Sequence, residues 1–195
     1  MSGPVAYTYQ NPSFEDLAVD GDLFTHNSNN SHHTVVLFDP LIKAGLTKFE
    51  VTNIDHLYGV GIADESVKYQ QDQSPIANGN SKVVQYWSGG GLEHISKELT
   101  EGNEDYSKEG SRVALELNMD SNPRTLTFFY NDVEQPNYII NIPPAVRFWA
   151  HLWSRGTSFK VNKFERLSEP TAKHLEGKSQ PLVWGKDWKK KCVIQ

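Results

Sequence analysis

The sequence predicts an all-β protein, a two-sheet antiparallel β-sandwich of the jelly-roll type. Three observations indicate this fold class. Short runs rich in Val, Ile, Phe and Tyr recur between residues 34 and 165, separated by Gly, Asn, Asp and Pro. Several runs alternate apolar and polar residues, as a strand with one buried face does. No stretch in this region keeps the 3.6-residue period of an amphipathic helix.

The chain of 195 residues divides into three parts. Residues 1–33 are expected to be an N-terminal extension, partly packed or disordered, because Asn27–His33 is a polar tract with little to bury. Its aromatic and aliphatic residues predict a short flap: Tyr7, Tyr9, Phe14, Leu17 and Phe24. Residues 34–167 are expected to form the sandwich and residues 168–195 a tail, in which Glu169–Glu176 is predicted to make a turn or two of helix.

Nine strands are predicted in the sandwich. In chain order they are Thr34–Phe38, Thr47–Asn53, Tyr58–Ala63, Lys82–Trp87, Arg112–Met119, Thr125–Tyr130, Tyr138–Asn141, Arg147–Trp153 and Thr157–Phe164. Alternation assigns their faces. In the eighth strand, for example, Phe148, Ala150 and Leu152 oppose Arg147, Trp149, His151 and Trp153.

The order of these motifs resembles the SPRY domain, a concanavalin-like sandwich of two antiparallel sheets. The resemblance covers Thr34–Leu167 and is carried by three segments in order: Gly45–Val51, Tyr58–Ala63 and Thr125–Asn131. Asp132 stands where the family often has Gly after the Asn, which predicts a hairpin turn that is longer or of another type. The resemblance implies recognition of a protein or peptide by loops at one end of the sandwich.

Two long connections, Asp64–Ser81 and Ser88–Glu109, are the candidate binding loops, since long loops in a compact domain are usually functional or disordered. Tyr69 and Tyr106 are their predicted anchors. A second candidate surface is the strand face with Trp149 and Trp153, followed by Arg155. If open, this face offers residue types enriched at interfaces; if the N-terminal flap or the tail covers it, it is core, and the rarity of large exposed apolar patches favours cover.

The end of the sequence has the pattern of a lipid anchor. Cys192, the only cysteine, is followed by Val, Ile and Gln, which is a C-a-a-X prenylation signal with a final residue typical of farnesylation. The basic residues before it supply the second signal that a single lipid chain needs: Lys186, Lys189, Lys190 and Lys191. The sequence therefore predicts a prenyltransferase and an anionic membrane surface as partners, with the protein on the cytoplasmic side of a membrane.

Charge divides the chain in the same way. The net charge is −5, and from Val183 onward it is +3, so the preceding body carries about −8. Such a body repels phosphate, which argues against a nucleic-acid partner. Trp184 and Trp188 flank the basic tail and fit two interpretations: insertion at lipid headgroups, or packing on the body. The sequence has no basic, apolar leader typical of secretion and no run of roughly 20 apolar residues.

Catalysis is not indicated. The sequence has no nucleophile elbow, zinc-protease helix or phosphate-binding loop, and its one cysteine lies in the tail. His26, His32 and His33 lack the carboxylate or cysteine spacing of a metal site. We therefore predict no catalytic residue, metal or cofactor, and a non-catalytic protein- or peptide-binding module. The alternative is a carbohydrate- or small-molecule-binding sandwich with a pocket lined by Trp149 and Trp153.

Overall fold

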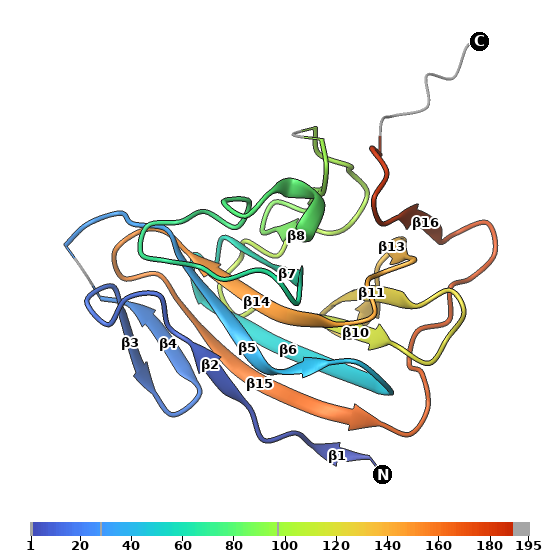
Figure 1. Ribbon diagram of the computed structural model, residues 1–195, viewed down its shortest axis with the longest axis horizontal. Helices are drawn as coiled ribbons and strands as arrows, with labels where there is room; N and C mark the ends of the chain where they lie inside the picture. The colour runs from blue at the N-terminus through green and yellow to red at the C-terminus, as the bar shows by residue number, and fades with distance from the viewer. Residues whose placement is uncertain (1, 28, 97, 189–195) are drawn as a thin grey trace.

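The computed structural model describes residues 2–27, 29–96 and 98–188, and their strands lie in two sheets packed face to face (Figure 1). The described strands of the larger sheet are β1 (Gly3–Pro4), β3 (Leu17–Asp20), β4 (Leu23–His26), β6 (Leu46–Asp55), β10 (Arg112–Asn118), β11 (Thr125–Tyr130), β12 (Val133–Glu134), β13 (Asn137–Ile140), β15 (Ser158–Leu167) and β16 (Gln180–Val183). Eight of them follow in the order β16-β13-β11-β10-β6-β15-β4-β3, with β1 paired to β15 and β12 to β11. The pairing is antiparallel except between β13 and β16, which are parallel.

The smaller sheet has the order β2-β5-β14-β7-β8-β9. Its described strands are β2 (Thr8–Gln10), β5 (Thr34–Ile42), β7 (Gly59–Asp64), β8 (Val83–Trp87), β9 (Leu92–Glu93) and β14 (Val146–Leu152). A single 3₁₀ turn, η1 (Asn80–Lys82), precedes β8 in the described chain. Each of the nine predicted strands corresponds to one of these elements, so the predicted two-sheet β-sandwich is confirmed.

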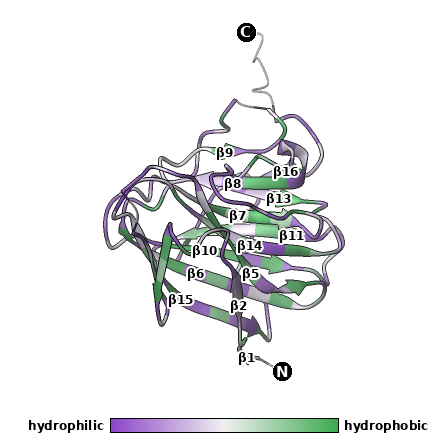
Figure 2. Cartoon of the chain, turned by 60° about the vertical axis from the view of Figure 1, so that its left-hand side comes forward, coloured by the Kyte–Doolittle hydropathy of each residue, from purple (hydrophilic) through white to green (hydrophobic). Residues whose placement is uncertain are grey.

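The core lies between the two sheets, and hydrophobic and hydrophilic residues alternate along the strands (Figure 2). Phe49 of β6 stacks on Phe148 of β14 with ring centroids 5.1 Å apart, which joins the centres of the two sheets. Phe148, Ala150 and Leu152 all belong to this core, as their alternation predicted. Burial of each large apolar side chain here contributes about 1.5–3 kcal/mol to folding.

The N-terminal segment is more ordered than the sequence suggested. β2 extends the smaller sheet beside β5, while β3 and β4 extend the larger one beside β15. Phe24 is fully buried and stacks on Phe159 at 4.9 Å. Phe14 is different: it was predicted to pack in a flap, but its side chain is 85% exposed.

The turn between β11 and β12 is a tight one. Tyr130 pairs with Val133, which leaves Asn131 and Asp132 as a two-residue turn with φ of 45° and 70°. Positive φ at both positions is typical of a type I′ hairpin. Arg112 stabilises it, because its backbone N–H donates to Asn131 Oδ1 at 2.9 Å and its guanidinium pairs with Asp132. The prediction of a longer or different turn was therefore wrong.

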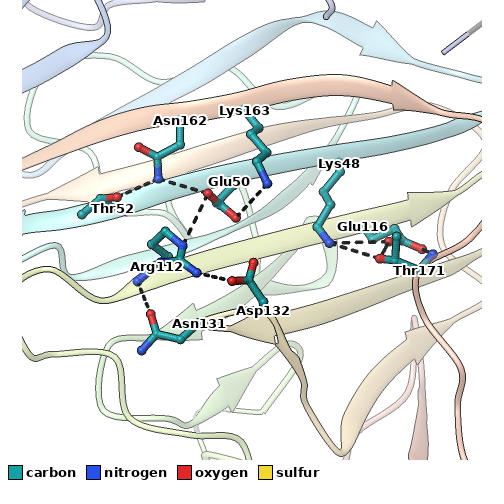
Figure 3. Close-up of polar contacts among 10 residues, drawn as sticks. All are labelled: Lys48, Glu50, Thr52, Arg112, Glu116, Asn131, Asp132, Asn162, Lys163 and Thr171. Atoms are coloured by element: carbon teal, nitrogen blue, oxygen red, sulfur yellow. Dashed lines mark hydrogen bonds and ion pairs between the residues drawn. The ribbon is translucent and has the colours of Figure 1, made fainter. Parts of the chain in front are cut away.

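Residues 168–179 cross the outer face of the larger sheet in a largely extended strap, where the sequence predicted a helix. Glu116 of β10 accepts the backbone N–H (2.9 Å) and the hydroxyl of Thr171 (Figure 3). It also accepts the backbone N–H of Ala172 at 3.2 Å. Glu134 accepts the backbone N–H groups of Lys173 and His174 at 2.6 and 2.9 Å. Because an isolated helix this short is marginal in water, these carboxylates decide the extended conformation.

A second buried carboxylate lies on the same face. Glu50 of β6 is 3% exposed, and Figure 3 shows it among Arg112, Lys163 and Asn162. The two cations lie 3.8 Å from its oxygens, and the Asn162 amide donates to it at 3.2 Å. A buried charge needs such partners, so these contacts account for Glu50 as a structural group.

The end of the described chain is docked on the sandwich. His94 lies between Trp184 and Trp188, with ring centroids 4.7 and 5.1 Å away, and both indoles pack against the core. His94 Nδ1 bonds the oxygen of Val83 at 2.7 Å, so it is the donor, and Nε2 accepts the N–H of Gly185 at 2.8 Å. Of the two interpretations of these tryptophans, the structure supports packing on the body.

Lys186 is exposed beside this docked segment. Lys189, Lys190, Lys191 and Cys192 lie outside the described residues. Among the residues that are described, no helix is long and apolar enough to cross a bilayer.

Candidate binding surface at the loop end

Four connections gather at one end of the sandwich, which we call the loop end: residues 29–33, 54–58, 88–111 and 153–157. Hydrogen bonds join them. The backbone N–H of Ser88 donates to the oxygen of Tyr58 at 3.0 Å, and that of Tyr106 to the oxygen of Ser88 at 2.7 Å. Tyr58 also bonds Ser154 through its hydroxyl at 2.9 Å. The loops therefore form one connected surface.

Asn53 fixes two of these loops. Its buried side chain donates to the backbone oxygens of Tyr106 (3.1 Å) and Ser107 (2.9 Å) and accepts the N–H of Leu57 at 2.9 Å. A buried amide with its hydrogen bonds made holds a specific conformation. The turn after β6 and the loop before β10 are thereby held together.

Tyr106, a predicted partner-binding anchor, has no exposed surface. Its hydroxyl donates to the oxygen of Tyr86 at 2.6 Å, and the two rings meet edge to face at 4.9 Å. Burial raises the pKa of Tyr106 well above its ordinary value. Tyr106 thus supports the long loop from below and is out of a partner's reach in this structure.

Tyr69 and Trp149 belong to a second, smaller core on the outer face of the smaller sheet. Trp149 is fully buried, and Tyr69 packs on the same cluster with its hydroxyl bonded to the oxygen of Pro75 at 2.7 Å. The cover is the connection between β7 and β8, which also contributes Val67 and Ile76. The sequence favoured burial of the strand face with Trp149 under the N-terminal flap or the tail. The structure buries Trp149 under the β7–β8 connection instead.

Trp153 stands out at the loop end because it is both exposed and held. Its side chain is 41% exposed, yet it stacks on His33 at 4.9 Å and meets Tyr58 edge to face at 5.4 Å. Ile54, near the end of β6, is also 41% exposed. Of the predicted aromatic surface residues, Trp153 is therefore the most exposed.

Arg155 is exposed two residues further on, and its guanidinium donates to Asn29 at 3.2 Å. Arg147 lies near the start of β14, at the other end of this strand, where it pairs with Asp39 at 2.7 Å. Burial works against ionisation of Asp39, but its bonds from Gln10 and Arg147 prevail and lower its pKa. The arginines thus divide: Arg155 faces the loop end, and Arg147 has a structural partner.

Asp16 ties the 29–33 segment to the rest of the surface. It is fully buried and accepts hydrogen bonds from Asn30 (3.0 Å) and Gln71 (3.0 Å), while His32 Nδ1 lies 3.2 Å from it. Burial alone would raise its pKa, but these donors lower it to about 2. Nothing in the sequence pattern marked Asp16, because its partners come from two segments that are separate in the sequence.

A shallow hollow lies beside Tyr58. It measures about 100 Å³ and is lined by His56, Leu57, Tyr58, Ser88 and Ser107. Small-molecule sites usually enclose 300–1,000 Å³, so this hollow suits one side chain of a partner better than a whole ligand. On its rim, ligand atoms of Asp55, His56 and Glu109 lie within 4.8 Å of one another; the hydrogen bond from His56 to Asp55 raises the pKa of His56 and accounts for two of the three.

Comparison with known proteins gives matches among solved structures. No protein-family model matches the chain. No curated protein matches it either. Among solved structures, the SPRY domain of human HERC1 superposes with a TM-score of 0.58 at 15% identity, over 80% of this chain and 94% of that one. The fold is that of a SPRY domain.

Two further structures agree with this SPRY fold. A human SPRY domain gives a TM-score of 0.58 at 16% identity, over 79% of this chain and 96% of its own. The TRIM65 PSpry domain gives 0.60 at 12% identity, over 80% and 88%. The superpositions establish the SPRY architecture. Because the identities are this low, the ligand has to be argued from the loop end itself.

The sequence missed two residues of this surface. Tyr58 was assigned only to a strand and His33 to a polar linker. They share one signal, an aromatic side chain next to a polar turn. That signal does not separate exposed aromatics from buried ones such as Tyr106, because the distinction depends on how the loops fold back.

Proposed function

We propose that the protein is a non-catalytic protein- or peptide-binding module whose contact surface is the loop end. One observation carries the proposal: Trp153 is 41% exposed although His33 stacks on its ring and Tyr58 meets it edge to face. Exposed tryptophans fixed in position are typical anchors of interfaces, since they bury a large area with little loss of side-chain freedom.

The SPRY fold supports a binding role by analogy. The locked loops support it physically, because a surface ordered in advance loses less entropy on binding. The alternative of a carbohydrate or small-molecule site required a pocket lined by Trp149 and Trp153. Trp149 is fully buried under the β7–β8 connection, so it cannot line such a pocket.

A displayed library of random peptides tests the binding proposal. Enriched peptides are measured by calorimetry against wild type, Trp153→Ala and Leu175→Ala. Leu175, 51% exposed in the strap over the larger sheet, is the matched control. We expect affinity to fall about tenfold or more with Trp153→Ala, which corresponds to 1.4 kcal/mol or more, and to stay unchanged with Leu175→Ala. Equal loss in both variants, or enrichment only on a glycan array, contradicts the proposal.

We propose in addition that farnesylation of Cys192 tethers this module to the cytoplasmic face of a membrane. The C-a-a-X pattern and Lys189, Lys190 and Lys191 support it, and the exposed Lys186 adds to the same charge. The test compares N-terminally tagged wild type with Cys192→Ser in cells. Release of the variant to the cytosol is expected; the same distribution for both overturns the tether and leaves the binding proposal intact.

A further inference from the structure

Two histidines share one hydrogen bond at the loop end. His33 Nδ1 and His151 Nε2 lie 3.0 Å apart, and the two rings are stacked at 5.2 Å. Only one proton fits between two nitrogens at this distance, so one ring donates and the other must offer a lone pair. The contact therefore requires at least one of these imidazoles to be neutral.

The burial of His151 decides which ring donates. His151 is 1% exposed, and its Nδ1 has no hydrogen-bond partner among the described residues. Orphaned buried N–H groups are rarer in proteins than orphaned acceptors, so the lone pair belongs on Nδ1 and the proton on Nε2. His151 then donates to His33, and His33 must keep a bare, neutral Nδ1.

His33 in turn closes part of the surface. Its ring covers one face of Trp153, and its backbone N–H donates to Asp72 Oδ1 at 3.0 Å. Asp72 belongs to the β7–β8 connection, so His33 joins that connection to the end of β14. A proton added to Nδ1 would point at the proton on His151 Nε2, and the pair would separate.

We propose that His33 and His151 form an acid-sensitive clasp, in which protonation of His33 uncovers Trp153 and the ring of His151. This inference deepens the proposed function, since it makes the anchor of the binding surface more accessible at lower pH. The partner it favours there has an apolar or aromatic side chain that replaces the His33 ring on Trp153.

Charged and titratable groups around His33 and His151 affect the protonation that opens the clasp. Asp72 faces His33 from the β7–β8 connection, and its carboxylate favours a proton on His33. His26 of β4 also opposes a proton on His151 by charge repulsion. Asp16 lies 3.2 Å from His32 Nδ1 and accepts a hydrogen bond from Asn30, which ties this part of the segment to β3 and the turn before it. Arg155 is held by Asn29 at 3.2 Å and adds a fixed positive charge beside this segment.

The balance of these effects favours neutral rings in the closed form. Burial lowers the pKa of His33, with Asp72 offsetting part of the change. Burial, followed by His33 and His26, lowers the pKa of His151 to about 3. Both folded values lie below the ordinary 6.5, so the closed form is fully favoured above about pH 6.5 and loses ground as the pH falls.

The expected change in the ratio of open to closed forms follows from the linkage between protonation and opening. If His33 alone regains its ordinary pKa on opening, the ratio of open to closed forms rises by up to about tenfold between pH 7.5 and 5.5. If His151 also becomes accessible, the rise is up to about a hundredfold.

Long-range proton–nitrogen NMR of the full chain tests the clasp directly, because it reports the tautomer and titration of each imidazole. We expect His151 to carry its proton on Nε2 at pH 7.5. We also expect His33 to titrate below 6.5, together with a shift of the Trp153 indole signal. A proton on His151 Nδ1, or a His33 titration that leaves Trp153 unchanged, overturns the proposal.

Two variants give an independent measurement. His33→Phe keeps an aromatic ring on Trp153 without a titrating group, and we expect it to stay closed, with constant Trp153 signals from pH 7.5 to 5.5. His33→Lys carries a fixed charge, and we expect it to be open throughout. His56→Phe is the control, since His56 is 74% exposed on its side chain and pairs with Asp55 outside the clasp. If the clasp opens but Trp153→Ala leaves peptide affinity unchanged, the binding proposal fails and the clasp stands.

Discussion

Asn53 donates from its side-chain amide to the backbone oxygen of Tyr106 at 3.1 Å, so the residue near the end of β6 holds the loop that leads into β10. The same side chain bonds Ser107 and Leu57, at 2.9 Å each. One buried amide thus determines the shape of two loops of the candidate binding surface.

Replacing Asn53 with Ala leaves two carbonyls and one N–H group without their partner in a buried place. We expect the free energy of unfolding to fall by about 2–4 kcal/mol, measured by urea denaturation. Asn162→Ala is the control: Asn162 is exposed and donates to Glu50 and Thr52, and its loss is expected below about 1 kcal/mol. Equal losses in the two variants contradict the role assigned to Asn53.

Gly61 of β7 lies directly under Trp149. A Cβ at this position would be 1.9 Å from the oxygen of Val84 and 2.7 Å from the Trp149 ring. Gly61→Ala must therefore displace the neighbouring strand or the indole, and we expect a loss of about 1–3 kcal/mol or more. Gly89→Ala, which meets no atom within 4 Å, is expected to change stability by less than about 0.5 kcal/mol. A stable Gly61→Ala protein would show that the loop over Trp149 is loosely packed.

Glu116 holds the strap by accepting three hydrogen bonds from Thr171 and Ala172. Glu116→Gln replaces one acceptor oxygen with an NH₂ group facing those donors. We expect a loss of about 1–3 kcal/mol and faster hydrogen exchange at residues 171–174. Thr171→Ser keeps the hydroxyl and should exchange as wild type does; unchanged exchange in the Gln variant would mean that the strap is held elsewhere.

His94 makes the docking of the C-terminal segment depend on pH. Burial lowers its pKa, although the bond to Val83 offsets part of this. The docked form needs a neutral Nε2 to accept from Gly185. A depressed folded pKa means that docking is fully stabilised above about pH 6.5 and weakens as the pH falls below it. Hydrogen exchange at Gly185, corrected for intrinsic rates, should therefore increase from pH 7.5 to 5.5.

The variant His94→Gln supplies the control for this pH effect. Its amide can donate to Val83 and accept from Gly185 but does not titrate in this range. We expect exchange at Gly185 in this variant to be independent of pH. If it depends on pH as in wild type, another group controls the docking.

Regular strands were the predictable part of this fold. The alternation in β10, β11 and β14 identified both their existence and their buried faces, because one apolar face per strand is a local property of the sequence. Strands β1 to β4, β9, β12 and β16 were missed. Each is four residues or shorter, and such segments are ordered only by the partner strands beside them, which no local pattern reveals.

The candidate surface was less predictable for a related reason. The two long loops and Trp153 were identified, but Tyr106 and Trp149 are buried. Their burial results from loops that fold back over the sheets, through contacts such as Asn53 with Tyr106 and Tyr69 over the Trp149 cluster. Aromatic composition marks such residues as important and does not say which side of a loop they occupy.

The parallel strand β16 forms one edge of the larger sheet. It covers β13, from Asn137↔Gln180 to Ile140↔Val183, and it contains Pro181, which has no N–H to offer a further strand. Short edge strands with a proline discourage pairing between molecules. Removing the chain from residue 180 onward would uncover four residues of β13, including the buried Ile139. An uncovered strand edge can pair with another molecule, so we expect forms that lack the chain from residue 180 onward to self-associate through β13.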